Sequence, residues 1–155
     1  MLEVGDKAPD FTATDAQGNT VRLADYAGRK LVLYFYPKDN TPGCTSQACD
    51  FRDNYHRFQA QGYAILGVSR DTAESHKRFA QKYDLPFPLL VDTDLALLKA
   101  YDAWGEKTMY GKTTMGTLRK TYVIDENGII RDIVKKVNTK APTAQILKEQ
   151  TKEKE

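Results

Sequence analysis

Two mostly apolar runs, at residues 31–36 and 63–69, most strongly constrain how this chain can fold. Runs of this length without polar alternation are typical of strands buried on both faces of a sheet. Between them, apolar residues recur at spacings of three and four over residues 44–61, which predicts an amphipathic helix. A strand, a helix and a second buried strand in succession favour a parallel pair joined by a right-handed crossover.

The remaining patterns extend this unit into a mixed α/β sheet. Residues 11–14 and 20–23 flank a loop that contains glycine, so they predict an N-terminal hairpin. The other expected elements are a helix from residue 71 or 72 to 83, a strand over 89–91, a helix over 95–101, strands over 118–124 and 129–134, and a helix from about 142. Residues 102–116 show no clear period and are expected to form a long loop. We therefore expect one domain over residues 1–155, with helices on both faces of a central sheet and residues 151–155 frayed.

Composition narrows the functional classes. The chain has 23 basic and 21 acidic residues and a net charge of +2, which does not favour binding to nucleic acid or to an anionic membrane. No run approaches the roughly 20 apolar residues of a membrane span, and residues 1–7 lack the apolar core of a signal peptide. We expect a cytoplasmic protein. In that reducing compartment, a close cysteine pair is more often catalytic, redox-sensing or metal-binding than structural.

The two cysteines are Cys44 and Cys49. Cys44 follows a loop at the predicted start of a helix, where free backbone amides and the helix dipole favour a thiolate. Thr41 lies three residues earlier and can offer a hydroxyl to a bound oxygen, while Pro37 and Pro42 restrict the loop. A thiolate is the nucleophile that peroxide chemistry requires, and its first product is a sulfenic acid.

The spacing of the pair constrains any disulfide between them. On an intact helix, the Cα atoms of Cys44 and Cys49 would stand about 8–9 Å apart and roughly 140° around the axis. A disulfide requires Cα atoms within about 7 Å. If this pair is catalytic, the reaction must therefore be coupled to local unwinding of residues 44–49.

The residues around Cys44 resemble a known family. The pattern Pro37-x-x-x-Thr41-x-x-Cys44 is similar to the active-site pattern of peroxiredoxins, and residues 36–49 resemble the peroxiredoxin Q group, also called bacterioferritin comigratory proteins. The resemblance covers nearly the whole chain. Further similar segments lie at residues 5–11, 104–107, 110–112 and 116–119.

This resemblance implies a thioredoxin-like fold and the reduction of hydrogen peroxide and organic hydroperoxides. It makes Cys44 the peroxidatic residue, Cys49 the resolving residue, and Arg119 the arginine that holds the thiolate and the peroxide. It also implies that thioredoxin or a similar dithiol protein restores the thiols. We expect no cofactor and no metal, and we expect a monomer because no second apolar face stands out.

Two other functional classes are open at this point. A metal-binding module could use both cysteines with His56 and His76, although structural zinc sites usually pair their ligands at closer spacings. A thioredoxin-like disulfide reductase is the other, but that chemistry favours Cys-x-x-Cys. We expect both histidines to be exposed and Trp104 to serve packing, whereas Gln47 could either brace the loop or face solvent.

Overall fold

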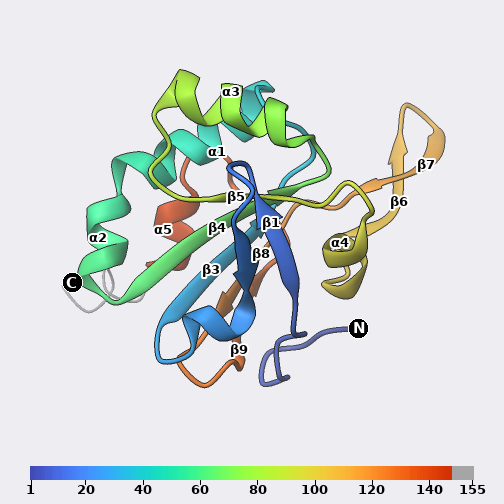
Figure 1. The fold of residues 1–155 in the computed structure, drawn as a ribbon. Coiled ribbons are helices and arrows are strands. Elements are labelled where there is room, and N and C mark those ends of the chain that lie inside the picture. The colour runs from blue at the N-terminus through green and yellow to red at the C-terminus, as the bar shows by residue number, and fades with distance from the viewer. Residues whose placement is uncertain (148–155) are drawn as a thin grey trace.

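The apolar run at residues 31–36 forms the central strand β3 (Lys30–Phe35) of a computed structural model that describes residues 1–147 (Figure 1). Successive side chains of a strand point to opposite faces of the sheet. Those of β3 divide between two separate cores, Leu31, Leu33 and Phe35 on one side and Val32 and Tyr34 on the other. Both faces are covered, and this is why the run has no polar alternation.

The sheet has seven strands in the order β2-β1-β5-β4-β3-β8-β9. Strand β3 pairs in parallel with β4 and antiparallel with β8, and β4 pairs in parallel with β5. Strands β1 and β2 pair antiparallel, as do β8 and β9, so the expected parallel unit, N-terminal hairpin and closing antiparallel strands are confirmed. The other strand bounds are β1 (Thr12–Asp15), β2 (Thr20–Arg22), β4 (Tyr63–Ser69), β5 (Leu89–Val91), β8 (Lys120–Ile124) and β9 (Ile130–Val134).

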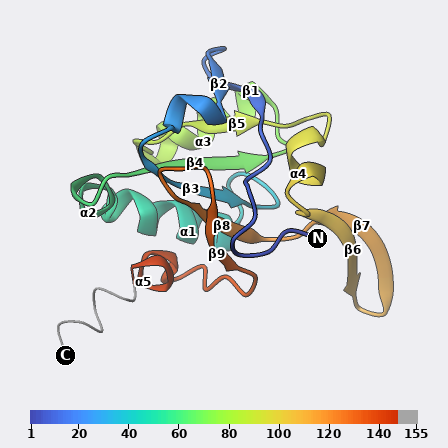
Figure 2. The same cartoon turned by 90° about the horizontal axis from the view of Figure 1, so that it is seen from below.

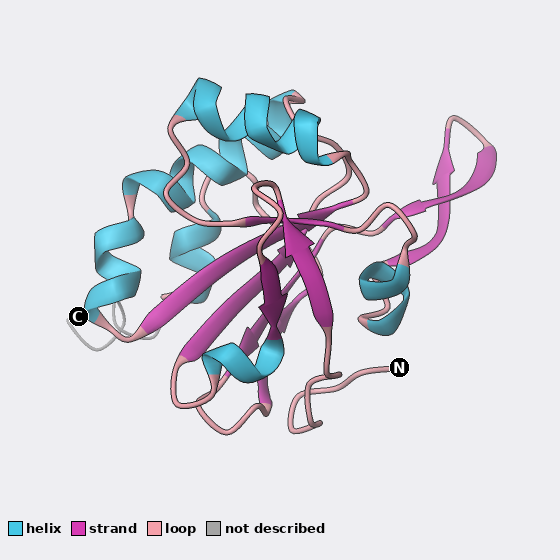
Figure 3. Ribbon diagram, viewed as in Figure 1, coloured by secondary structure: helices cyan, strands magenta, loops and turns pink. Residues whose placement is uncertain are grey.

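Helices cover both faces of the sheet, as expected (Figure 3). Four helices pack on the face that carries Val32 and Tyr34, namely α1 (Pro42–Asp53), α2 (Tyr55–Ala60), α3 (Ala73–Tyr83) and α5 (Pro142–Ile146). The opposite face packs against α4 (Ala96–Ala100) and the 3₁₀ helix η1 (Leu23–Tyr26). The larger helical layer therefore lies on the side of the sheet where α1 begins.

The prediction of a long loop over residues 102–116 is wrong. These residues form most of a hairpin of β6 (Trp104–Met109) and β7 (Lys112–Thr117), which extends away from the rest of the molecule (Figures 1 and 2). Tyr110 and Gly111 turn the chain with φ values of 53° and 78°, as a tight hairpin requires. Most of its side chains are exposed, so the apolar alternation by which a strand is recognised never arises.

The single helix predicted over residues 44–61 is also divided. It begins earlier, at Pro42, and breaks at Asn54 between α1 and α2. The Asn54 side chain donates to the Asp50 carbonyl oxygen at 2.8 Å, a local bond by which asparagine competes with helical backbone bonding. The apolar spacing persists across the break because Phe51 and Phe58 pack in the same core.

Helices are short throughout residues 1–147. The longest, α1, has 12 residues, and none in that range is both long and apolar enough to cross a membrane. The expected fraying of residues 151–155 lies outside the described residues.

Candidate active site

Cys44 lies in the first turn of α1, where the chain turns back after β3. Thr41 is the N-cap residue and Pro42 takes the first helical position, where its missing N–H removes no helical hydrogen bond. The Thr45 amide donates to the Thr41 carbonyl at 2.8 Å and closes the first turn. The expected position of Cys44 at a helix N-terminus is confirmed, and its side chain is only 1% exposed.

Arg119 reaches the same place from the other end of the sequence. Its Nη2 donates to the Cys44 Sγ at 3.3 Å, and its Nη1 donates to the Gln47 Oε1 at 2.9 Å. The sheet explains this proximity, because the first residue of β8, Lys120, lies opposite the last residue of β3, Phe35. A guanidinium at this distance stabilises a negative charge on the sulfur.

Gln47 is a bracing residue and does not face solvent. It is fully buried, and its side-chain oxygen fixes the guanidinium that touches Cys44. Gly43 completes the close packing, since a Cβ there would lie 3.4 Å from the Arg119 Nη2 and 3.7 Å from the Thr139 Cγ2. The guanidinium thus lies between the first turn of α1 and the segment joining β7 to β8, which carries Arg119.

Tyr34 is a neighbour that the sequence analysis did not single out. Its ring packs 4.9 Å from that of Phe51 and lies over Gly67 of β4, where an added Cβ would come within 2.9 Å of the hydroxyl. Burial raises the pKa of Tyr34 well above its ordinary value, and charge on Cys44 raises it further. The hydroxyl therefore keeps its proton. Within residues 1–147, the Tyr34 hydroxyl and the Gln47 Nε2 are the buried side-chain groups with no hydrogen-bond partner.

The loop before α1 contains the other two expected site residues. Pro37 lies two residues after the end of β3 and is half-buried, as is Thr41. The Thr41 hydroxyl donates to the Lys38 carbonyl at 2.9 Å, so its oxygen lone pairs stay available to an incoming donor. The structure thus brings Thr41 and Cys44 together at one helix start, with Pro37 at the beginning of the same loop.

Cys49 lies on the same helix, two turns from the N-cap. Both thiols are free, with Cys44 buried and Cys49 half-buried. Since α1 is continuous from Pro42 to Asp53, the structure shows the folded, reduced arrangement of the pair. The geometric condition for a disulfide, unwinding of the first turns, therefore applies to this helix.

The expected exposure of the histidines is right for His56 and wrong for His76. His76 is fully buried, bonded through Nδ1 to Asp39 and through Nε2 to the Leu90 carbonyl. Across residues 1–147, one group of side chains is close enough to share a metal ion, and it consists of Asp39, Asp71 and His76 without either cysteine. The metal module built on the cysteines and histidines is therefore not assembled. Trp104 is half-buried, with the Arg70 guanidinium 5.5 Å from its ring.

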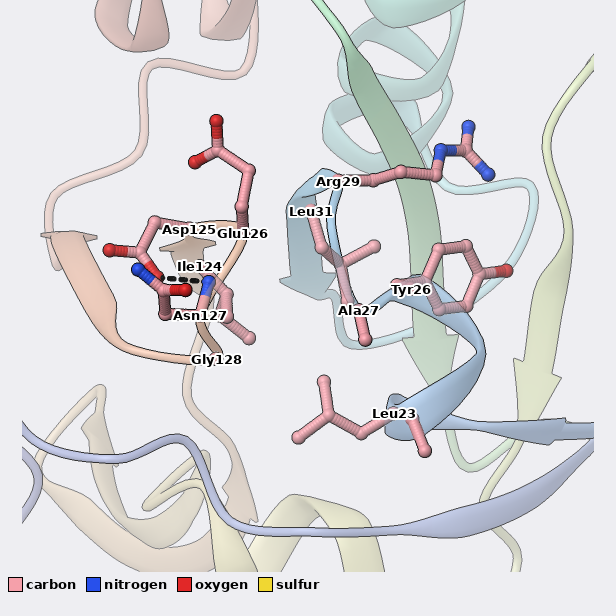
Figure 4. A pocket seen from close by; sticks show the side chains of 11 residues that line it. Leu23, Tyr26, Ala27, Arg29, Leu31, Ile124, Asp125, Glu126, Asn127 and Gly128 are labelled. Atoms are coloured by element: carbon pink, nitrogen blue, oxygen red, sulfur yellow. Dashed lines mark hydrogen bonds between the residues drawn. The ribbon is translucent and has the colours of Figure 1, made fainter.

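A separate pocket of about 320 Å³ lies at the opposite end of the sheet (Figure 4). Its walls include Leu31 at the start of β3 and Ile124 at the end of β8, with Tyr26 and Arg29 on one side and Glu126 on the other. Cys44 follows the other end of β3, so this pocket cannot present a ligand to the thiol.

Known proteins are similar to this chain in sequence. The model of the AhpC/TSA family matches residues 4–133. A putative peroxiredoxin of Mycobacterium tuberculosis is 52% identical over 90% of this chain and 88% of its own length. Peroxiredoxin Bcp of Bacillus subtilis is 47% identical over 94% of this chain and 93% of its own.

Solved structures of peroxiredoxins are similar to this chain in fold. The bacterioferritin comigratory protein of Xanthomonas campestris, solved in a study of its alkyl peroxide reduction, superimposes with a TM-score of 0.87 at 36% identity, over 100% of this chain and 99% of that one. A cysteine mutant of the Xylella fastidiosa peroxiredoxin Q gives 0.91 at 33% identity, with the same coverage. The chain therefore belongs to the AhpC/TSA family, as one of its thioredoxin-like peroxiredoxins.

Proposed function

We propose that the chain reduces hydrogen peroxide and organic hydroperoxides with Cys44 as the attacking thiolate. The observation that carries this assignment is the buried Cys44 sulfur at a helix N-terminus, 3.3 Å from the Arg119 guanidinium. The sulfur attacks one peroxide oxygen, the O–O bond breaks, and the leaving oxygen takes a proton to depart as water or an alcohol. Cys44 then carries a sulfenic acid.

Arg119 and Thr41 act on the peroxide during this step. The guanidinium holds the negative charge on the sulfur and on the oxygens as the O–O bond lengthens. The Thr41 oxygen can accept a hydrogen bond from the peroxide, because its own proton is donated to the Lys38 carbonyl. Pro37 has a structural part, since its fixed φ and missing N–H restrict the loop beside the thiol.

Cys49 resolves the sulfenic acid in the second step. Its thiol attacks the Cys44 sulfur, water leaves, and an intramolecular disulfide remains. A dithiol protein of the thioredoxin type then exchanges with this disulfide and restores both thiols. Each cycle thus converts one peroxide and one external dithiol into water or alcohol, water and one external disulfide.

The contacts of α1 limit how far it must unwind. Its final turns are tied to neighbouring helices, since the Thr143 amide donates to the Asp50 carboxylate at 2.9 Å and the Arg52 guanidinium donates to the Tyr83 carbonyl at 2.7 Å. Within residues 1–147, the side-chain hydrogen bonds to residues 42–49 come from Arg119, which donates to Cys44 and Gln47. We infer that unwinding stops near residue 50.

Replacing Cys49 by serine tests whether Cys44 alone reacts with peroxide and Cys49 resolves the product. We expect Cys49→Ser to consume close to one equivalent of peroxide per chain and then to stop turning over with a thioredoxin system, because Cys44 still reacts but no intramolecular disulfide forms. The measurement is peroxide consumed per chain, with and without thioredoxin, thioredoxin reductase and NADPH. Full thioredoxin-driven turnover in this variant would contradict a resolving role for Cys49.

Oxidation should destabilise the protein. Unwinding residues 44–49 gives up helical hydrogen bonds and loosens the packing of buried Ala48, and the disulfide does not restore these contacts. We expect the reduced form to melt a few degrees higher, since roughly 1 kcal/mol corresponds to about 2–4 °C in a chain of this size. Thermal melts and hydrogen exchange of reduced and peroxide-treated protein measure this. A more stable oxidised form with residues 44–49 still protected would exclude the unwinding step.

The setting of the reaction follows from its chemistry. A catalytic disulfide that is reduced after every turnover suits a reducing compartment, so we place the chain in the cytoplasm.

We further propose that the monomer is active, because Cys44, Cys49, Thr41 and Arg119 all belong to one chain. A peroxide assay run beside an insulin-reduction assay separates this function from that of a disulfide reductase, which would reduce insulin and leave peroxide unchanged.

A further inference from the structure

The loop that leads to Cys44 is anchored through one buried carboxylate, that of Asp39, which is 6% exposed. It accepts hydrogen bonds from the Tyr36 hydroxyl at 2.6 Å, the Ser75 hydroxyl at 2.7 Å and the His76 Nδ1 at 2.7 Å. The Asp39 backbone amide in turn donates to the Asp71 carboxylate at 3.0 Å. One loop residue is thus held by Tyr36 just after β3, by the segment after β4 and by α3.

His76 ties this carboxylate to the central sheet. Its Nε2 lies 2.9 Å from the carbonyl oxygen of Leu90 on β5, and a carbonyl oxygen can only accept, so Nε2 carries a proton. Its Nδ1 faces a carboxylate oxygen, so a second proton lies between that nitrogen and Asp39. Both ring nitrogens are occupied. His76 is therefore engaged at both nitrogens by groups of the fold itself.

Other groups keep this arrangement in place. Burial raises the pKa of Tyr36 well above its ordinary value, and Tyr34 and the negative charge of Asp39 raise it further. The Tyr36 hydroxyl therefore remains a donor. The Asp71 carboxylate accepts from the Ser69 hydroxyl at 2.5 Å, which orients it toward the Asp39 amide. The charged groups facing the network from outside are Arg78 and Lys82, which line a hollow of about 280 Å³ beside Asp39.

The loop conformation depends on such anchoring. Asn40, the residue after Asp39, has a φ of 59°, in the left-handed region that is uncommon for residues other than glycine and that asparagine enters more readily than most. The next residue, Thr41, is the N-cap of α1 and offers its oxygen toward the peroxide. A displacement of Asp39 would therefore pass through one residue, Asn40, to the N-cap and the first turn that carries Cys44.

We propose that His76 is a positioning residue for peroxide reduction, acting through Asp39 on the loop at residues 37–41. It touches neither the thiol nor the peroxide. Instead it fixes the N-cap Thr41 relative to Cys44, so that the peroxide is aligned for attack. The proposal rests on Cys44 being the peroxidatic thiol, as argued above.

Two substitutions of His76 separate its contacts. An asparagine amide reaches about as far as the Nδ1 of histidine and can donate to Asp39, whereas glutamine reaches about as far as Nε2 and can donate to the Leu90 carbonyl. We expect His76→Gln to lower the rate constant for peroxide at least about tenfold, because a misplacement on the order of 1 Å can cost up to a hundredfold. We expect His76→Asn to stay within about threefold of the parent. Stopped-flow measurement of Cys44 oxidation gives these values.

Alkylation of Cys44 by iodoacetamide is the second readout. It needs the thiolate but no aligned O–O bond, so a positioning role predicts that His76→Gln changes this rate by less than about twofold. General loosening would instead speed alkylation of the buried thiol. Equal peroxide rates in His76→Gln and the parent, or equal losses in His76→Gln and His76→Asn, would overturn the proposal. If the parent itself did not react with peroxide, the proposed function would fail, and that result is distinct from either.

Matched controls complete the test. His56→Gln changes an exposed histidine on α2 and should leave both rates unchanged. Should His76→Gln fail to fold, Ser75→Ala removes one donor to Asp39 from the same helix. We expect it to lower the peroxide rate severalfold with alkylation unchanged, and an unchanged peroxide rate would also overturn the proposal.

Discussion

Replacing Cys44 by serine is expected to abolish peroxide reduction. A serine hydroxyl is not appreciably ionised near neutral pH, so neither the helix N-terminus nor Arg119 can convert it into a comparable nucleophile. Cys49 cannot substitute, because it lies on a later turn of α1 and the Arg119 guanidinium is bonded to Cys44 and Gln47. Peroxide-dependent NADPH oxidation through a thioredoxin system measures the loss.

The Cys44→Ser variant should keep its fold. Serine is slightly smaller than cysteine, and its oxygen can accept the hydrogen bond that the Arg119 Nη2 now donates to sulfur. A melting temperature close to that of the parent would show that lost activity is chemical. Cys49→Ser is the matched control, since it also removes one thiol from α1 but should still reduce one equivalent of peroxide. Substantial turnover by Cys44→Ser would remove Cys44 from the mechanism.

Replacing Arg119 by alanine is expected to slow the reaction of Cys44 with peroxide on the order of a hundredfold or more. The guanidinium is positioned before the reaction begins, with one nitrogen on the Cys44 sulfur and the other on the Gln47 side-chain oxygen. In the proposed reaction its charge therefore stabilises the thiolate and the separating oxygens without further reorganisation. Stopped-flow rate constants over a series of peroxide concentrations give the effect, and a thermal melt shows whether the variant remains folded.

Two further variants define what Arg119 contributes. Arg119→Lys keeps the charge but replaces the planar fork, whose two nitrogens bond to Cys44 and Gln47, by a single nitrogen, so its rate should lie between those of the parent and the alanine variant. Arg131→Ala removes an arginine that pairs with Asp125 at the other end of the sheet and should leave the rate unchanged. A parent-like rate in Arg119→Ala would exclude Arg119 from the site.

Local sequence patterns determined most of the secondary structure. The expected strands at residues 63–69 and 89–91 match β4 and β5 at both ends, and the expected capping by residue 71 or 72 is made by Thr72, whose side chain accepts from the Ser75 amide at 3.2 Å. These features depend on residues within a few positions of one another. The same holds for the loop and helix start around Cys44, where proline, threonine and cysteine are close in the sequence.

Tertiary structure alone decided which distant residues meet. Arg119 reaches Cys44 because β8 pairs with β3, a long-range contact that no periodicity near either residue reveals. His76 was expected to be exposed, yet Asp39 and the Leu90 carbonyl satisfy both ring nitrogens and allow its burial. The β6–β7 hairpin was predicted as a loop because most of its side chains are exposed. A strand pair of this kind needs no apolar alternation, which is the pattern that predicts a strand. Local sequence patterns therefore indicate which segments are buried, whereas the tertiary fold determines which distant residues satisfy a buried polar group.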